Sequence, residues 1–192
     1  MTEIAKTTRW SVLRWAVLLV TFIAPPTIAK SPLQGTVWES AALVYDLDPV
    51  LLYAIALTES KKRRANKQIA PWPWTFNSPE GSYYAASLEE AEAYLEMLLG
   101  KYAPRRIDVG IMQINLGWNG HLVERYEDLL DPEINVRVGA QVLKEALEDT
   151  DGDTLLGVGW YHNRSDINRS VWYGTLVLNR YERLRVFFES QG

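Results

Sequence analysis

Cysteine is absent from this chain of 192 residues, and histidine occurs only twice, as His121 and His162. Without cysteine the chain can form no disulfide and can offer no thiolate as a nucleophile or metal ligand. A zinc site would need carboxylates to complete the ligand set of the two histidines. We therefore expect neither a metal nor a cofactor.

Positive charge is also scarce. The chain has 20 Lys and Arg against 24 Asp and Glu, a formal net charge of −4. Residues 1–29 hold three of the basic side chains and one acidic one, so residues 30–192 carry 17 basic and 23 acidic side chains, a net charge of −6. Because such a protein gains little from counterion release, nucleic acid is not expected as its principal ligand.

One long apolar run stands near the N-terminus, at residues 15–24. Lys6, Arg9 and Arg14 precede it, and small residues ending at Ala29 follow it. A charged segment, a short apolar segment and a small-residue end are typical of a secretory signal peptide, so we predict that residues 1–29 are removed after Ala29. An uncleaved N-terminal anchor is the alternative. Either way, the globular part is expected to be exported to the periplasm.

Helix signals dominate the rest of the chain. An Asp or Ser followed by Pro predicts a helix start, and Ser87 with Glu90 forms a capping box. Apolar residues then recur at helical spacing after several of these starts. The starts are Ser31-Pro32, Asp48-Pro49 and Asp131-Pro132, and the stripes are Ala91/Leu95/Leu98, Val138/Val142/Ala146 and Val177/Tyr181/Leu184/Phe188. The prediction is a mainly α-helical single domain at residues 30–192, with at most a small β-hairpin near residues 108–115.

Two segments lack a helical pattern. Residues 66–84 concentrate proline, aromatic and turn-forming residues, which predicts an extended, ordered surface loop. Residues 108–120 hold three glycines around a short apolar core, which indicates tight turns where something approaches the backbone closely. No repeat or linker divides the chain.

The stretch AIALTES, residues 54–60, places Glu59 at the end of an apolar helix. The negative end of the helix dipole and apolar neighbours such as Ile55 both disfavour a charged carboxylate there. A carboxyl that stays protonated near neutral pH suits a general acid that donates a proton to a leaving oxygen, as glycosidases require. The alternative is a frayed helix end at which Glu59 lies in water and residues 61–64 neutralise it.

Four motifs in order resemble those of the soluble lytic transglycosylases, glycoside hydrolase family 23, whose fold is goose-lysozyme-like. They are ALTES, VGIMQIN, DPEINVRVGAQVL and GVGWYHN, between Asp48 and Asn163. The stretches APWPWTFN, SYY and IDVGIMQIN further resemble the subset associated with conjugative elements and transenvelope secretion systems. The resemblance implies that the substrate is the glycan strand of peptidoglycan. It also implies partners in a conjugative or type IV-like secretion machine.

The resemblance assigns roles residue by residue. Glu59 would be the catalytic acid and base, and Tyr161 would be the tyrosine whose hydroxyl lies near it. The further residues expected to bind substrate or to orient the acid are Ser60, Gly110, Met112, Gln113 and Asn115. The chain departs from the family pattern after Tyr161, where His162 follows and Asn163 comes one position late, so these two residues receive no role.

Only one acid has a convincing environment, whereas ordinary glycosidases use two carboxylates. Asp108 is the nearby candidate for a second one, with a turn residue as the simpler interpretation. A single acid suffices where the substrate assists, and the family's product is then a 1,6-anhydromuramyl end. A goose-type lysozyme, which is a hydrolase, and an inactive peptidoglycan-binding scaffold module remain as alternatives.

Two further groups of residues bear on a glycan ligand. Trp72 and Trp74, between prolines, are predicted to offer flat faces on which sugar rings stack. The basic run at residues 61–64 is either a solvated face or a site that attracts the carboxylates of peptidoglycan.

Overall fold

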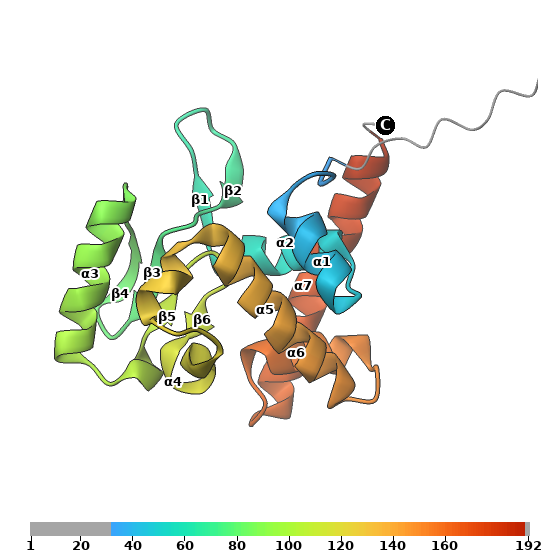
Figure 1. Ribbon diagram of the computed structural model, residues 1–192. Coiled ribbons are helices and arrows are strands. Elements are labelled where there is room, and N and C mark those ends of the chain that lie inside the picture. The colour runs from blue at the N-terminus through green and yellow to red at the C-terminus, as the bar shows by residue number, and fades with distance from the viewer. Residues whose placement is uncertain (1–31, 191–192) are drawn as a thin grey trace, which may run out of the picture.

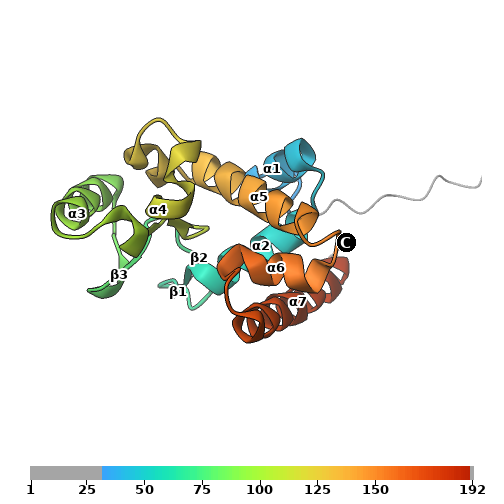
Figure 2. The same ribbon diagram turned by 90° about the horizontal axis from the view of Figure 1, so that it is seen from below.

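The computed structural model describes residues 32–190, drawn in colour in Figure 1. The predicted signal peptide and its cleavage site lie outside the described residues. The expected mainly α-helical architecture is confirmed, because the described residues form seven α-helices and only a small amount of β-structure. In Figures 1 and 2 the helices α1, α2, α6 and α7 gather on one side and the β-sheet with α3 on the other.

Helix α2 (Pro49–Glu59) lies at the centre of the helical side. The Asp48 carboxylate accepts a hydrogen bond from the Val50 amide at 2.7 Å, and Pro49 begins the helix without an amide to satisfy. Its neighbour α1 (Val37–Tyr45) is followed by Asp46, which caps the helix with a left-handed backbone. Five of the 11 residues of α2 are buried, so the helix is fixed by packing along most of its length.

Three further helices complete this side of the molecule. Helix α5 (Pro132–Glu148), α6 (Thr154–His162) and α7 (Ile167–Glu189) begin at aspartates whose carboxylates accept hydrogen bonds from first-turn amides. Helix α7 packs against both α2 and α6. This packing brings the first half of α7 to the end of α2, where Glu59 lies.

The β-structure is larger than the predicted hairpin. A separate hairpin pairs β1 (Lys61–Arg63) with β2 (Ile69–Pro71), and a four-stranded antiparallel sheet has the order β4-β3-β5-β6. Its strands are β3 (Thr75–Ser78), β4 (Gly81–Tyr84), β5 (Asp108–Val109) and β6 (Ile114–Asn115). The predicted hairpin at 108–115 exists as β5 and β6, two strands of this sheet.

The prediction of a loop at residues 66–84 is therefore wrong, since most of this segment forms β2, β3 and β4. These strands have three or four residues each, too few for a period-two pattern to appear in the sequence. Strand β2 pairs with β1 and β4 pairs with β3, and only β3 pairs with β5, about 30 residues further along the chain. Prolines and turn-forming residues lie in and between these short strands, and for that reason the segment had the sequence pattern of a loop.

Helix α3 (Leu88–Lys101) packs its apolar face toward the sheet, with Ala91, Leu95 and Leu98 buried as the spacing predicted. Short helical segments complete this side of the molecule: η1 (Pro104–Arg106), α4 (Leu116–Asn119), η2 (Gly120–Leu122) and η3 (Tyr126–Leu130). Within residues 32–190, no single helix is long and apolar enough to cross a membrane, and only α1 with α2, bent by 118°, passes that test as a pair.

Candidate active site

The centre of the candidate site is Glu59, the last residue of α2. The hydroxyl of Tyr173, a buried residue of α7, donates a hydrogen bond to its carboxylate. Burial raises the pKa of Glu59 to about 7; the hydrogen bond from Tyr173 opposes that rise, and the negative charge of Asp108 adds to it. The carboxyl is thus ordered against α7 instead of frayed in water, and near neutral pH it can both give and take a proton.

Ser60 follows Glu59 and is fully buried. Its hydroxyl lies 2.7 Å from the carbonyl oxygen of Ile111 and 3.1 Å from that of Ala56. The side chain therefore connects the end of α2 to the turn at residues 110–113. Since the side chain has no exposed surface, it is not positioned to contact a glycan directly, and its hydrogen bonds instead fix the end of α2 that carries Glu59.

That turn is built on unusual backbone angles. Gly110 has φ of 87° and Gln113 has φ of 52°. A side chain on Gly110 would place its Cβ 2.0 Å from Nδ2 of Asn135, so the site requires glycine both for its conformation and for its space. The side-chain Nε2 of Gln113 donates to the carbonyl oxygens of Thr75 and Gly110, both at 2.9 Å, and holds the turn against β3.

Met112 does not line the site as expected. Its side chain is fully buried and packs against Gly139 of α5, where an added Cβ would lie 2.8 Å from three of its atoms. The backbone of Met112, not its side chain, reaches the site. Its carbonyl oxygen accepts a hydrogen bond from the hydroxyl of Tyr161 at 2.7 Å.

Asn135 organises the turn from α5 and was not recognised in the sequence. It is fully buried; its Oδ1 accepts from the Met112 amide at 2.8 Å, and its Nδ2 donates to the carbonyl oxygens of Val109 and Leu129 at 3.0 and 2.9 Å. The available signal was a polar residue in register with the apolar stripe of α5, because residues 135, 138 and 142 share a helix face. A polar group at such a position must be satisfied inside the protein.

Asn115 serves the backbone as well. Its Oδ1 accepts from the amides of Gly117 and Trp118, which caps α4, and its Nδ2 donates to Asp108 Oδ1 at 2.8 Å. The other oxygen of Asp108 lies 3.5 Å from Nδ2 of Asn77. Burial raises the pKa of Asp108 while these amides oppose the rise. With both of its oxygens engaged by neighbouring strands, Asp108 fits a structural role better than that of a second catalytic carboxylate.

Two tyrosines lie at the site: Tyr161, which was expected near the acid, and Tyr173, to which the sequence pattern assigned no role. Burial raises the pKa of the Tyr161 phenol well above its ordinary value, and the nearby charge of Glu59 adds to this rise. The Tyr161 hydroxyl, however, donates its hydrogen bond to the carbonyl oxygen of Met112. Tyr173 makes the contact with Glu59 instead. In sequence, Tyr173 only extends the apolar stripe of α7 that continues at Val177 and Tyr181, so it had the appearance of an ordinary core residue.

His162 and Asn163 acquire distinct positions. The His162 ring stacks on Tyr173 with centroids 4.5 Å apart and planes inclined by 5°. Burial lowers its pKa, although the negative charge of Asp108 opposes this. Asn163 accepts hydrogen bonds from the amides of Ser165 and Asp166 and so shapes the turn between α6 and α7.

The predicted sugar platforms at Trp72 and Trp74 are largely engaged within the protein. Their indole nitrogens donate to the carbonyl oxygens of Ala85 and Leu130 at 2.8 and 3.2 Å, and the ammonium of Lys62 lies 4.0 Å from the Trp72 ring centroid. By contrast, Trp118 and Trp172 expose 75% and 62% of their surface.

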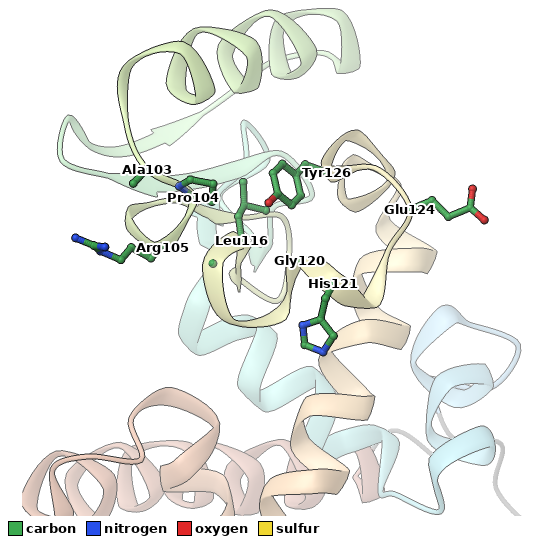
Figure 3. A pocket seen from close by; sticks show the side chains of 9 residues that line it. Ala103, Pro104, Arg105, Leu116, Gly120, His121, Glu124 and Tyr126 are labelled. Atoms are coloured by element: carbon green, nitrogen blue, oxygen red, sulfur yellow. The ribbon is translucent and has the colours of Figure 1, made fainter.

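A hollow of about 610 Å³ beside α4 contains none of the residues around Glu59. Figure 3 shows the side chains that line it, which come from η1, α4, η2, the first residue of η3 and the residues just before η1 and η3. Leu116 and Tyr126 form its apolar part, with Arg105, His121 and Glu124 around it. Across the described part of the chain, no three His, Asp or Glu side chains are grouped as a metal site would require.

The family model described as "Transglycosylase SLT domain" matches residues 36–172, well over half of the chain. The match begins just before α1 and ends one residue before Tyr173. No curated protein and no solved structure matches the chain.

Proposed function

Since the chain belongs to the transglycosylase SLT domain family, whose members generally act on peptidoglycan, we propose that it is a lytic transglycosylase. It cleaves the β-1,4 bond between N-acetylmuramic acid and N-acetylglucosamine and leaves a 1,6-anhydromuramyl end. The observation that carries this proposal is the environment of Glu59, whose pKa of about 7 lets one carboxyl act first as acid and then as base.

The proposed reaction needs no second carboxylate from the protein. Protonated Glu59 donates its proton to the leaving oxygen, O4 of N-acetylglucosamine, as the bond from C1 of the muramyl sugar to that oxygen breaks. The acetamido oxygen of the muramyl sugar stabilises the cationic C1. The Glu59 carboxylate then accepts the proton of the 6-hydroxyl as O6 bonds to C1, which restores the acid and consumes no water.

The contacts of the site support this use of one acid. The hydrogen bond from Tyr173 stabilises the carboxylate that exists between the two proton transfers. Asp108, the carboxylate whose charge acts on Glu59, is held by the amides of Asn115 and Asn77. A nucleophilic role for Asp108 would require it to leave these partners.

We further propose that the domain works in the periplasm, either after loss of residues 1–29 or anchored by them. There it would open the wall locally for a conjugation or secretion machine. The export pattern at the N-terminus and the resemblance of residues 70–84 and 107–115 to the conjugation-associated subset support this role. Labelling of an exported fusion in intact and permeabilised cells would test the location.

The reaction is tested by mass spectrometry of the soluble fragments that residues 30–192 release from purified peptidoglycan. We expect fragments lighter by one water that end in anhydromuramic acid, and none from Glu59→Gln. Reducing ends would instead indicate a lysozyme and return attention to Asp108. No release by either protein, with binding to peptidoglycan retained, would indicate an inactive binding module.

A further inference from the structure

A second hollow, of about 390 Å³, lies where α2, the β1–β2 hairpin and α7 meet. It is called the basic groove below, and its lining residues are Leu57, Lys61, Ile69, Arg180, Arg183 and Leu184. Three of the six are cations and three are aliphatic, and the lining includes no acidic residue. A protein with an excess of 4 acidic side chains thus gathers positive charge around one apolar floor.

The cations of this groove are not neutralised by the protein. Neither Lys61 nor Arg183 takes part in any ion pair among residues 32–190. Arg180 donates a hydrogen bond to the hydroxyl of Thr58. Burial lowers the pKa of Arg180, and the nearby charge of Arg183 adds to that lowering. Like charges held together without a counter-ion are the arrangement expected of a site for an anion.

The hairpin adds to this charge by its register. Lys61 pairs with Pro71 and Arg63 with Ile69, and paired residues of an antiparallel ladder lie on the same face. Lys61 and Ile69 line the groove, so Arg63 shares their face. Lys62 faces the opposite way and covers Trp72. Because side chains alternate along the strand, the successive basic residues of this run do not all face the groove.

The groove is close to the catalytic acid. Thr58, which binds Arg180, is the residue before Glu59. On α7, Arg180 lies seven residues after Tyr173, which is two helical turns along the same face, or roughly 10 Å at 1.5 Å per residue. An extended peptide covers about 3.3 to 3.6 Å per residue, so about three residues span that distance.

We propose that the basic groove binds the stem peptide of the muramyl sugar at the cleavage point, with Lys61 and Arg183 contacting its carboxylates. The apolar floor of Leu57, Ile69 and Leu184 suits the alanine methyl groups of such a peptide. This proposal rests on the proposed function, because it takes peptidoglycan as the substrate. It assigns part of the basic run at 61–64 to substrate selection: the enzyme prefers strands that still carry peptides.

The test uses the full chain carrying Glu59→Gln, so that binding is measured without cleavage. Two soluble glycan fragments of equal length are titrated by calorimetry, one with stem peptides and one stripped of them by an amidase. We expect Arg183→Ala and Lys61→Gln each to weaken binding of the peptide-bearing fragment by about tenfold and to leave the stripped fragment unaffected. Arg183→Lys should recover most of the loss.

Arg137 provides the matched control, because it is an exposed arginine of α5 that forms no ion pair within residues 32–190. Arg137→Ala should bind both fragments like the parent. Equal losses on both fragments with Arg183→Ala, or no loss on either, would overturn the proposal. Binding to vesicles of phosphatidylglycerol is measured alongside the two fragments. If Arg183→Ala weakens only the binding to vesicles, the groove is a membrane contact and the proposal is overturned. Release of anhydromuramyl products by the wild type tests the proposed function independently of these outcomes.

Discussion

Replacing Glu59 by glutamine should abolish lysis and, at the same time, stabilise the protein at alkaline pH. Glutamine has nearly the same shape as glutamate and its amide oxygen can still accept the hydroxyl of Tyr173. The change therefore removes the charge and keeps most of the packing. The difference in the free energy of unfolding between the variant and the wild type therefore measures the destabilisation caused by a charged carboxylate at this position.

The size of the effect follows from the pKa of Glu59, which is about 7 in the fold against 4.5 for an ordinary glutamate. One pKa unit corresponds to about 1.4 kcal/mol, and partial contact of the residue with solvent reduces the total, so the charged form costs the fold about 2 to 3 kcal/mol. Between pH 4.5 and 7 the folded state keeps a proton that the unfolded state has lost. Stability of the wild type therefore falls as pH rises through this window and levels above it.

Urea unfolding at pH 4 and pH 8 measures this difference. We expect Glu59→Gln and wild type to be equally stable at pH 4 and the variant to be more stable by about 2 to 3 kcal/mol at pH 8. Glu92, an exposed glutamate of α3, supplies the control, since Glu92→Gln should change stability by less than about 0.5 kcal/mol at both pH values. A gain that is equal at both pH values, or no gain at pH 8, would refute the reasoning.

Three further predictions concern the surroundings of the acid. Tyr173→Phe removes the donor that favours the charged form of Glu59, so kcat should fall about tenfold or more and the alkaline limb of the pH–rate profile should move to higher pH; an unmoved limb would contradict the assigned contact. Asn135→Ala leaves the partners of three buried hydrogen bonds unsatisfied. It should lower the free energy of unfolding in urea by about 3 kcal/mol or more, and a loss below about 1 kcal/mol would show that the turn does not depend on Asn135. Gly110→Ala combines a φ of 87° with a Cβ placed 2.0 Å from Asn135 and should lower stability by at least about 1 kcal/mol in thermal unfolding, an unchanged midpoint being the opposing result.

The sequence alone was enough for features that arise within a few residues. The starts of α2, α3 and α5 depend on the side chains of Asp48, Ser87 and Asp131, which accept hydrogen bonds from amides two or three positions ahead. Of the predicted capping box only the Ser87 half forms, because the Glu90 carboxylate accepts from the Ala86 amide. The mainly helical fold class could be predicted because apolar residues at helical spacing mark the buried face of each helix separately. Glu59 could be singled out because both the helix end and its apolar neighbours are visible in a stretch of seven residues.

Only the tertiary structure decided how the acid is surrounded. Tyr173 lies 114 positions from Glu59 and Asn135 lies 23 positions from Met112, and such pairs meet only when α2, α5 and α7 pack. The same holds for β3, which pairs with the distant strand β5, and for the basic groove, which joins a hairpin to a distant helix. A local pattern fixes how a residue's own segment folds, whereas its hydrogen-bond partners, its burial and therefore its pKa are set by whichever segments the packed core brings beside it.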